Sequence, residues 1–208
     1  MSQNTSSAVM QQRREPHNSL DDYPTPPWAT RALLEWIMSA GLLKGPCREP
    51  AANRGHMVKP LREYFNEVEA SDIFDYGAGF PQRDYLFGPD PDPVDWTITN
   101  PPFRLAEQFI ARALATSTRG VAVIVRSAFL EGVGRHRDLF SKRPPSDVLQ
   151  FSERVVMHKG KLSAKGSTAT AYCWLVWRLD DNAGGPRFHW IPPCRKRLEL
   201  ASDYEAAA

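Results

Sequence analysis

The sequence is poor in the features that mark several large classes of protein. Its 208 residues include only three cysteines, Cys47, Cys173 and Cys194, and their odd number and wide spacing argue against a disulfide framework. They fit a reducing compartment, so we expect a cytoplasmic protein. The five histidines show no metal-ligand spacing, and no metal is expected. No apolar run approaches the length of a membrane span, and the polar N-terminal segment lacks the apolar core of a signal peptide.

The charge balance is also small. A formal net charge of +2 permits a nucleic-acid partner but does not by itself indicate one. A hydrophobic content of 42% in a chain of this length fits one globular domain with a substantial core. We expect a polar N-terminal tail over residues 1–20, a single domain over 21–200 and a C-terminal tail over 201–208.

Strand and helix patterns alternate along most of the chain, which predicts an α/β fold. Apolar spacing predicts helices at about 28–41, through 57–65, at 105–114 and around 139–140. Strands are expected before residue 50 and at 67–73, 96–99, 120–125, 148–151, 168–179 and 188–191. The last two would be joined by a hairpin turn at 180–185. This pattern predicts a mostly parallel sheet with helices on both faces, whose last strand inserts antiparallel.

One stretch combines a strand with an unusual ending. Residues 96–99 read as a short buried strand that stops at Asn100, Pro101, Pro102 and Phe103. Because proline cannot donate to a sheet and fixes φ, a stiff loop is expected at this strand's carboxyl end, where α/β folds bind ligands. The Asn100 side-chain oxygen and the Pro101 carbonyl can accept hydrogen bonds from an exocyclic NH2 group, with Phe103 stacked on its ring.

This stretch resembles the Asn-Pro-Pro-Phe/Tyr loop of S-adenosylmethionine-dependent amino-methyltransferases, above all the DNA adenine-N6 methyltransferases. Three further segments resemble the same family, so that the likeness covers roughly residues 22–178. They are Tyr23-Pro24-Thr25-Pro26-Pro27, Glu49-Pro50-Ala51-Ala52-Asn53-Arg54-Gly55, and Phe129-Leu130-Glu131-Gly132. The second departs from the family pattern Glu-Pro-Ala-x-Gly-x-Gly, because Asn53 replaces the first glycine. Asparagine tolerates the left-handed backbone, but its side chain puts cofactor affinity in doubt.

The resemblance implies a Rossmann-like class I methyltransferase fold with seven strands, and S-adenosylmethionine as cofactor. Asp72 ends a short strand about 20 residues after the glycine turn, where an acid can accept both ribose hydroxyls, with Asp75 as the alternative. Asp84 matches the acid that receives the cofactor's adenine amine. The full set of expected cofactor residues is Tyr23, Thr25, Pro26, Glu49, Pro50, Ala51, Asn53, Gly55, His56, Met57, Asp72, Ile73, Asp84, Tyr85 and Leu86.

The implied activity is methyl transfer to the exocyclic N6 of adenine in DNA, with Asn100, Pro101, Pro102 and Phe103 as the catalytic loop. Such compact solitary enzymes resemble those of bacteria and their phages. RNA base amines and protein glutamine amides present the same planar NH2 group and stay open as substrates. Cytosine-N4 methylation is less expected, since those relatives usually carry serine in place of Asn100. A cofactor- or DNA-binding module without turnover is the remaining alternative.

A basic segment offers candidate nucleic-acid contacts. Residues 154–168 contain no acid and include Lys159, Lys161 and Lys165, and Arg126 follows the strand predicted at 120–125. A flexible basic loop beside a catalytic edge can contact phosphates, although charged loops are often simply solvated. We expect these four residues to touch DNA if the chain binds it.

Overall fold

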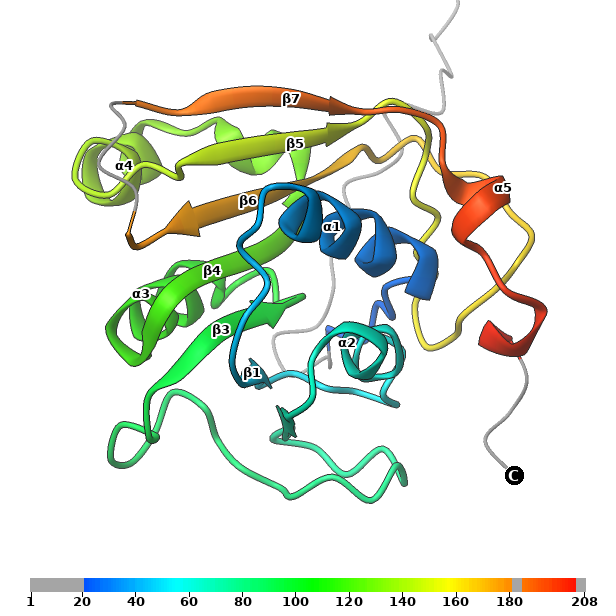
Figure 1. Ribbon diagram of the computed structural model, residues 1–208, viewed down its shortest axis with the longest axis horizontal. Helices are drawn as coiled ribbons and strands as arrows, with labels where there is room; N and C mark the ends of the chain where they lie inside the picture. The colour runs from blue at the N-terminus through cyan, green and yellow to red at the C-terminus, as the bar shows by residue number, and fades with distance from the viewer. Residues whose placement is uncertain (1–20, 181–184, 205–208) are drawn as a thin grey trace, which may run out of the picture.

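The computed structural model describes residues 21–180 and 185–204 and is built on one seven-stranded sheet with the order β2-β1-β3-β4-β6-β5-β7 (Figure 1). The strands are β1 (Cys47–Glu49), β2 (Val68–Ala70), β3 (Val94–Thr99), β4 (Ser117–Arg126), β5 (Asp147–Phe151), β6 (Tyr172–Arg178) and β7 (Arg187–Ile191). The predicted α/β class, the mostly parallel sheet and the number of strands are confirmed.

The closing strands are arranged differently from the prediction. The strand that inserts antiparallel is β6, which pairs with β4 on one side and β5 on the other. The last strand, β7, lies at the sheet edge and runs parallel to β5. The expected hairpin between β6 and β7 is therefore wrong, because β5 separates them. Part of the predicted turn, residues 181–184, lies outside the described residues.

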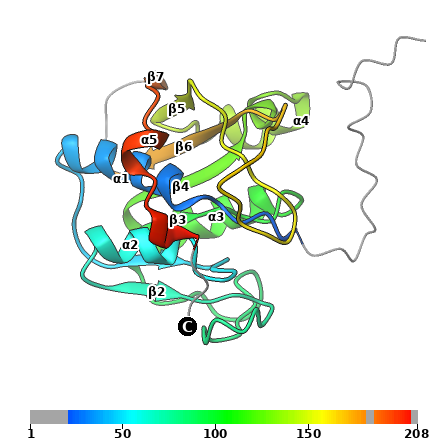
Figure 2. The same ribbon diagram turned by 90° about the vertical axis from the view of Figure 1, so that its right-hand side faces the viewer.

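Helices cover both faces of the sheet, as predicted (Figures 1 and 2). One face carries α1 (Pro27–Ser39), α2 (Val58–Tyr64) and α5 (Arg195–Leu198), and the other carries α3 (Ala106–Thr116), α4 (Val133–Arg135) and the π-helical η2 (His136–Phe140). Single 3-10 turns form η1 (Ser127–Leu130) and η3 (Ala201–Asp203). None of the helices in the described ranges is long and apolar enough to cross a membrane.

The apolar core follows from the alternation of side chains along the strands. In β4, Val121, Val123 and Val125 pack on the α3 side, whereas Ala122 and Ile124 pack on the α1 side. Both sets are buried, which explains why this strand reads as a continuous β-branched run. The apolar clusters on the two faces pack against the sheet and hold its parallel strands, so that their carboxyl ends lie along one edge.

A buried carboxylate ties three strands together at the opposite, amino end of β5. The Asp147 side chain is only 1% exposed and lies 3.0 Å from the Nε atoms of both Arg178 and Arg187. The His189 Nε2 atom lies 2.8 Å from the same carboxylate. These contacts link the first residue of β5 to β6 and β7, so the Asp147 cluster holds the three strands in register.

A second buried network attaches the C-terminal segment. Arg31 on α1 donates to Glu63 on α2 and, at 2.7 Å, to Asp203 in η3. It also donates to the carbonyl of Leu198 at 2.8 Å. Because Asp203 is fully buried there, the packed domain extends past the predicted boundary at residue 200 into the segment that was expected to be a tail. The predicted tail over 1–20 lies outside the described residues.

Candidate functional site

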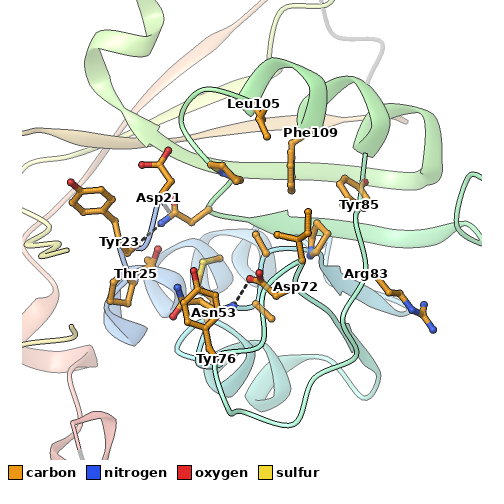
Figure 3. Close-up of a pocket in the computed structure, with 18 of the residues that line it drawn as sticks. Asp21, Tyr23, Thr25, Asn53, Asp72, Tyr76, Arg83, Tyr85, Leu105 and Phe109 are labelled. Atoms are coloured by element: carbon orange, nitrogen blue, oxygen red, sulfur yellow. Dashed lines mark hydrogen bonds between the residues drawn. The ribbon is translucent and has the colours of Figure 1, made fainter. Parts of the chain in front are cut away.

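A cleft lies at the carboxyl ends of β1, β2 and β3, the edge where the sequence predicted a ligand (Figure 3). Its walls come from the 21–25 segment, the turn after β1, the loop after β2, the Asn-Pro-Pro loop and the start of α3. The lining residues are Asp21, Tyr23, Pro24, Thr25, Pro50, Ala51, Ala52, Asn53, His56, Met57, Asp72, Ile73, Tyr76, Arg83, Asp84, Tyr85, Leu86, Asn100, Pro102, Leu105 and Phe109.

The turn after β1 keeps the left-handed backbone expected of a glycine, although Asn53 occupies the position of that glycine. Asn53 adopts a left-handed φ of 51°, and its amide nitrogen Nδ2 donates to Asp22 at 2.8 Å. Its side-chain oxygen accepts from the backbone N–H of Arg54 at 2.7 Å. Gly55 follows with a φ of 82°, and a Cβ there would lie 3.0 Å from the ring of Phe80. Gly55 thus serves the turn and the packing, while Asn53 has both ends of its amide engaged.

Glu49 lies beneath this turn rather than in the cleft wall. It is fully buried, and one carboxyl oxygen accepts from the Thr99 hydroxyl at 2.6 Å and from the Ala51 N–H at 3.0 Å. The other oxygen has no hydrogen-bond partner among the described residues. Burial raises the pKa of Glu49 to about 8, so the side chain is mostly protonated at neutral pH.

Two acids predicted for the cofactor line the cleft, and their carboxylates accept hydrogen bonds from backbone N–H groups. Asp72 accepts from the N–H groups of Asn53 and Phe74, each at 2.9 Å. Burial raises the pKa of Asp72. Asp84 accepts from the N–H of Leu86 at 2.9 Å. Carboxylates keep further lone pairs after such bonds, so both acids can still receive a ligand's donors.

Asn100 closes the cleft at the carboxyl end of β3. Its Nδ2 atom donates to the carbonyl of Tyr23 at 2.9 Å, and the Sδ atom of Met157 lies 4.0 Å from the same nitrogen. Its oxygen, Oδ1, is buried and has no partner in the part of the chain that the structure describes. Thr25 provides a second such atom in the cleft wall, since its buried hydroxyl also lacks a partner there.

Phe103 turns its ring toward other side chains rather than into the cleft. Its centroid lies 5.5 Å from that of Tyr23, with the rings tilted by 36°. The guanidinium carbon of Arg126, at the end of β4, lies 4.2 Å from the Phe103 centroid, over the ring. The Phe103 N–H donates to the Asp21 carboxylate at 2.6 Å. The 21–25 segment therefore contacts both the backbone and the ring of Phe103 in the Asn-Pro-Pro-Phe loop.

The basic segment 154–168 is more closely packed against the rest of the domain than the sequence indicates. Residues 155–157 are buried, and the N–H of Gly160 donates to the carbonyl of Asp22 at 2.8 Å. A flexible loop was expected over 154–168, but its first half is packed beside the cleft. Lys159, Lys161 and Lys165 are exposed on this segment.

Most of the predicted site residues meet at this cleft. Twelve of the fifteen expected cofactor residues line it, and the exceptions are Pro26, which precedes α1, together with Glu49 and Gly55. Asn100 and Pro102 line it too, whereas Pro101 and Phe103 are not part of the lining. The reserve acid Asp75 is not part of the lining and accepts from Gly77 instead.

Other lining residues were missed by sequence reasoning. Leu105 and Phe109 read as core positions of a helix, but Figure 3 shows both pointing from α3 into the cleft, across from Asn53 and Asp72. Tyr76 lies on the Asn53 side and has the Arg54 guanidinium 4.8 Å from its ring centroid. Tyr76 follows a strand-end acid by four residues, a signal too general to single it out.

Comparisons with known proteins identify the fold. The sequence matches no family profile and no curated protein. Among solved structures, one similar protein is provisionally assigned as a class I S-adenosylmethionine-dependent methyltransferase from Listeria monocytogenes, with 15% identity and a TM-score of 0.59 over 84% of this chain and 67% of that one. A provisionally assigned RNA methyltransferase from Pyrococcus horikoshii has 18% identity and a TM-score of 0.56, covering 82% of this chain and 95% of that chain.

A third similar structure is the modification subunit of a provisionally assigned type I restriction enzyme from Vibrio vulnificus. It has 15% identity and a TM-score of 0.56 and covers 96% of this chain, which spans 53% of that longer chain. The chain therefore has the Rossmann-like fold of class I methyltransferases. Identities this low show the fold alone. Within the described residues no cluster of three His, Cys, Asp or Glu side chains is placed to hold a metal ion.

Proposed function

We propose that this chain is an S-adenosylmethionine-dependent methyltransferase that acts on the exocyclic N6 amine of adenine in DNA. The Asn100 carboxamide is the observation that carries the proposal. The Tyr23 carbonyl can only accept, so its contact with Nδ2 orients the amide and leaves Oδ1 as an acceptor without a partner. An acceptor held in this way at the cleft suits a substrate that brings an N–H donor.

The cleft has donors and acceptors that fit the cofactor. We assign Asp72 to the ribose hydroxyls, Asp84 to the adenine amine and Thr25 to the methionine end, because all three line the cleft and the Thr25 hydroxyl has no partner among the described residues. Leu105 and Phe109 give the opposite wall an apolar surface suited to a purine ring. When bound, S-adenosylmethionine supplies a methyl group on a positively charged sulfur, which is a good leaving group. The similar protein from Listeria, described as dependent on this cofactor, agrees with this reading.

The protein's own contribution to the reaction is mainly alignment. An aromatic amine is a poor nucleophile because its lone pair is delocalised into the ring. Asn100 Oδ1 and the Pro101 carbonyl would accept its two N–H bonds and favour a more tetrahedral nitrogen, so that no strong base is needed. Pro101 and Pro102 keep the two acceptors rigid. Phe103 would stack on the base, which must leave the duplex to reach the loop.

Three substrate classes share the planar NH2 group, so the first experiment separates them. Purified protein is incubated with labelled S-adenosylmethionine and DNA lacking N6-methyladenine, as duplex and as single strands, and with RNA and a protein extract. We expect label in DNA, recovered as N6-methyladenine on nucleoside analysis. Label in RNA alone would favour the likeness to the Pyrococcus protein, and label in protein would point to glutamine amides. Cofactor binding without transfer to any of these would indicate a silent binding module.

The Asn100→Ala variant tests the mechanism. We expect kcat to fall by about 100-fold or more, since the variant removes an acceptor aligned with the reacting nitrogen. The Kd for S-adenosylmethionine, measured by calorimetry, should stay within about threefold of wild type, because Asn100 contributes only part of the cleft wall. The matched control is Asn66→Ala, an exposed asparagine after α2 whose loss should leave both quantities unchanged. Full activity in the Asn100→Ala protein would refute the mechanism.

A further inference from the structure

Arg126 occupies the surface that the proposed mechanism assigns to the target base. Its guanidinium carbon lies 4.2 Å from the centroid of the Phe103 ring, over its face. A guanidinium is planar and stacks on aromatic rings much as a base does. In the structure as it stands, Arg126 therefore covers a face of Phe103 that a flipped adenine would need.

The charge of Arg126 is not balanced by a nearby acid. Within residues 21–180 and 185–204, no carboxylate lies within ion-pair distance of it, and its Nε atom is buried without a hydrogen-bond partner. Its neighbours on the same sheet behave differently, since Arg119 pairs with Asp95 at 3.0 Å and Arg178 with Asp147 at 3.0 Å. Buried donors in native proteins are usually satisfied, so a donor without a partner among the described residues, beside this loop, is suited to a group that binds there.

We propose that Arg126 is a place-holder for the target base: it stacks on Phe103 in the substrate-free protein and moves to a backbone phosphate of the nucleic acid when the base enters. This inference rests on the proposed function and adds to it. Entry of the base and movement of Arg126 depend on each other, because the base can stack on this face of Phe103 only if the guanidinium leaves it. The guanidinium leaves at little cost in free energy only if an anion binds it. A phosphate next to the flipped nucleotide supplies that anion.

The exchange also discriminates between substrate classes. A glutamine amide in a protein offers an NH2 group but no phosphate beside it, so it would have to displace Arg126 without compensating its charge. A nucleic acid brings both parts at once. Arg126 is thus a positioning residue whose position favours nucleic acid over protein as the substrate.

Variants of Arg126 separate its charge from its planar shape. Arg126→Ala loses both, Arg126→Gln keeps a planar group without charge, and Arg126→Lys keeps the charge without the plane. KM for DNA is measured at several salt concentrations by methyl transfer. We expect the alanine and glutamine variants to raise KM about tenfold and to lower the slope of log KM against log salt by about one, as for the loss of one phosphate contact. Arg126→Lys should retain the wild-type slope.

The second readout follows the base itself. The methylated position is first located by sequencing the modified DNA. An oligonucleotide with this site then carries 2-aminopurine at the target position, and its fluorescence rises when the base unstacks from the duplex. At saturating oligonucleotide, we expect Arg126→Lys to give higher fluorescence than wild type, because its ammonium competes less well for the Phe103 ring. A merely structural arginine would change neither the salt slope nor this signal. Arg137→Ala is the matched control, since Arg137 is an exposed arginine paired with Asp138 on η2.

The outcomes distinguish this inference from the proposed function. Absence of transfer to DNA by the wild-type protein would defeat the proposed function. A wild-type enzyme active on DNA, together with an unchanged salt slope in both Arg126→Ala and Arg126→Gln, would overturn the phosphate contact. Equal fluorescence in wild type and Arg126→Lys would overturn the competition for the ring. Thermal melting and cofactor affinity are measured for each variant, and the glutamine and lysine proteins carry the test if the alanine protein does not fold.

Discussion

Two charged sites at opposite ends of the sheet are built on different principles. At the amino end of β5, one buried carboxylate, Asp147, is surrounded by Arg178, Arg187 and His189. At the carboxyl end of β4, Arg126 lies over an aromatic ring and has no ion-pair partner in the described ranges 21–180 and 185–204. At the first site the charges are paired with one another, whereas at the second the charge of Arg126 has no such partner among the described residues.

This difference separates a structural role from a binding role. Burying an ion is costly unless it is paired, so the partners of Asp147 are explained by the stability of the strands that it joins. Three of the buried atoms that lack a hydrogen-bond partner among the described residues, Asn100 Oδ1, Thr25 Oγ1 and Arg126 Nε, lie at or beside the cleft, although others, such as Arg48 Nη1 and Arg112 Nε, lie outside its lining. The position of these three atoms beside a cleft, rather than the missing partner alone, supports a binding role for this edge.

The sharpest way to break the comparison is to remove the centre of the Asp147 site. Asp147→Ala leaves two arginines and His189 without their shared acid, and we expect the free energy of unfolding to fall by roughly 3–5 kcal/mol. Arg126→Ala should change it by less than about 1 kcal/mol, since only a ring contact is lost. Urea unfolding measures both. A control is Asp138→Asn, because Asp138 is 46% exposed in its pairs with Arg137 and Lys142 and should contribute almost nothing. Equal losses for Asp147→Ala and Arg126→Ala would remove the distinction.

Glu49 combines features of the two sites, because one of its carboxyl oxygens accepts hydrogen bonds and the other has no partner among the described residues. Its pKa is raised by burial from an ordinary 4.5 to about 8, so between these values the folded protein holds a proton that the unfolded chain releases. This contribution to stability is complete below pH 4.5 and is lost as the pH rises toward 8. Glu49→Gln cannot ionise, so it should gain stability relative to wild type by on the order of 3 kcal/mol between pH 5 and 8.

Urea unfolding at pH 5, 6.5 and 8 measures this gain for Glu49→Gln against wild type. The matched control is Glu131→Gln, at an exposed glutamate that follows η1, where the two stability curves should run parallel. Parallel curves for Glu49→Gln would mean that Glu49 is ionised in the folded protein throughout this range.

The smallest expected effect concerns Asn53, whose side chain is saturated although it lines the cleft. Asn53→Gly restores the glycine of the family pattern and removes the bonds to Asp22 and Arg54. The Kd for S-adenosylmethionine, measured by calorimetry, should change by less than about threefold, because the amide is already turned to those partners. A tenfold tighter Kd would show instead that the asparagine crowds the cofactor.

The sequence predicted those parts of the structure that depend on local pattern. Buried strands such as 120–125 are recognised by their β-branched runs, and the proline-ended strand before Asn100 predicted the edge at which the cleft lies. The lining of the cleft by Asp72 and Asp84 was expected from their distance past the first turn and from family resemblance.

What the sequence did not predict depends on contacts between distant segments. Nothing local tells that β7 pairs with β5 rather than with β6, because both choices bury one face of an edge strand. The spacing of Leu105 and Phe109 is the same whether they meet a core or a cleft. The stacking of Arg126 on Phe103 joins residues from two strand ends, and only the register of β3 and β4 brings them together.

The buried pair of Arg31 and Asp203 sets the order in which the domain can be completed during protein synthesis. The two residues are 172 positions apart, and at about 5–20 residues per second the cation of α1 waits roughly 9–35 s for its acid. Until then, among the described residues, Glu63 on α2 is the acid available to Arg31. Helix α1 thus receives this buried partner only after β7 has been synthesised, so that η3 packs late in the folding of this chain.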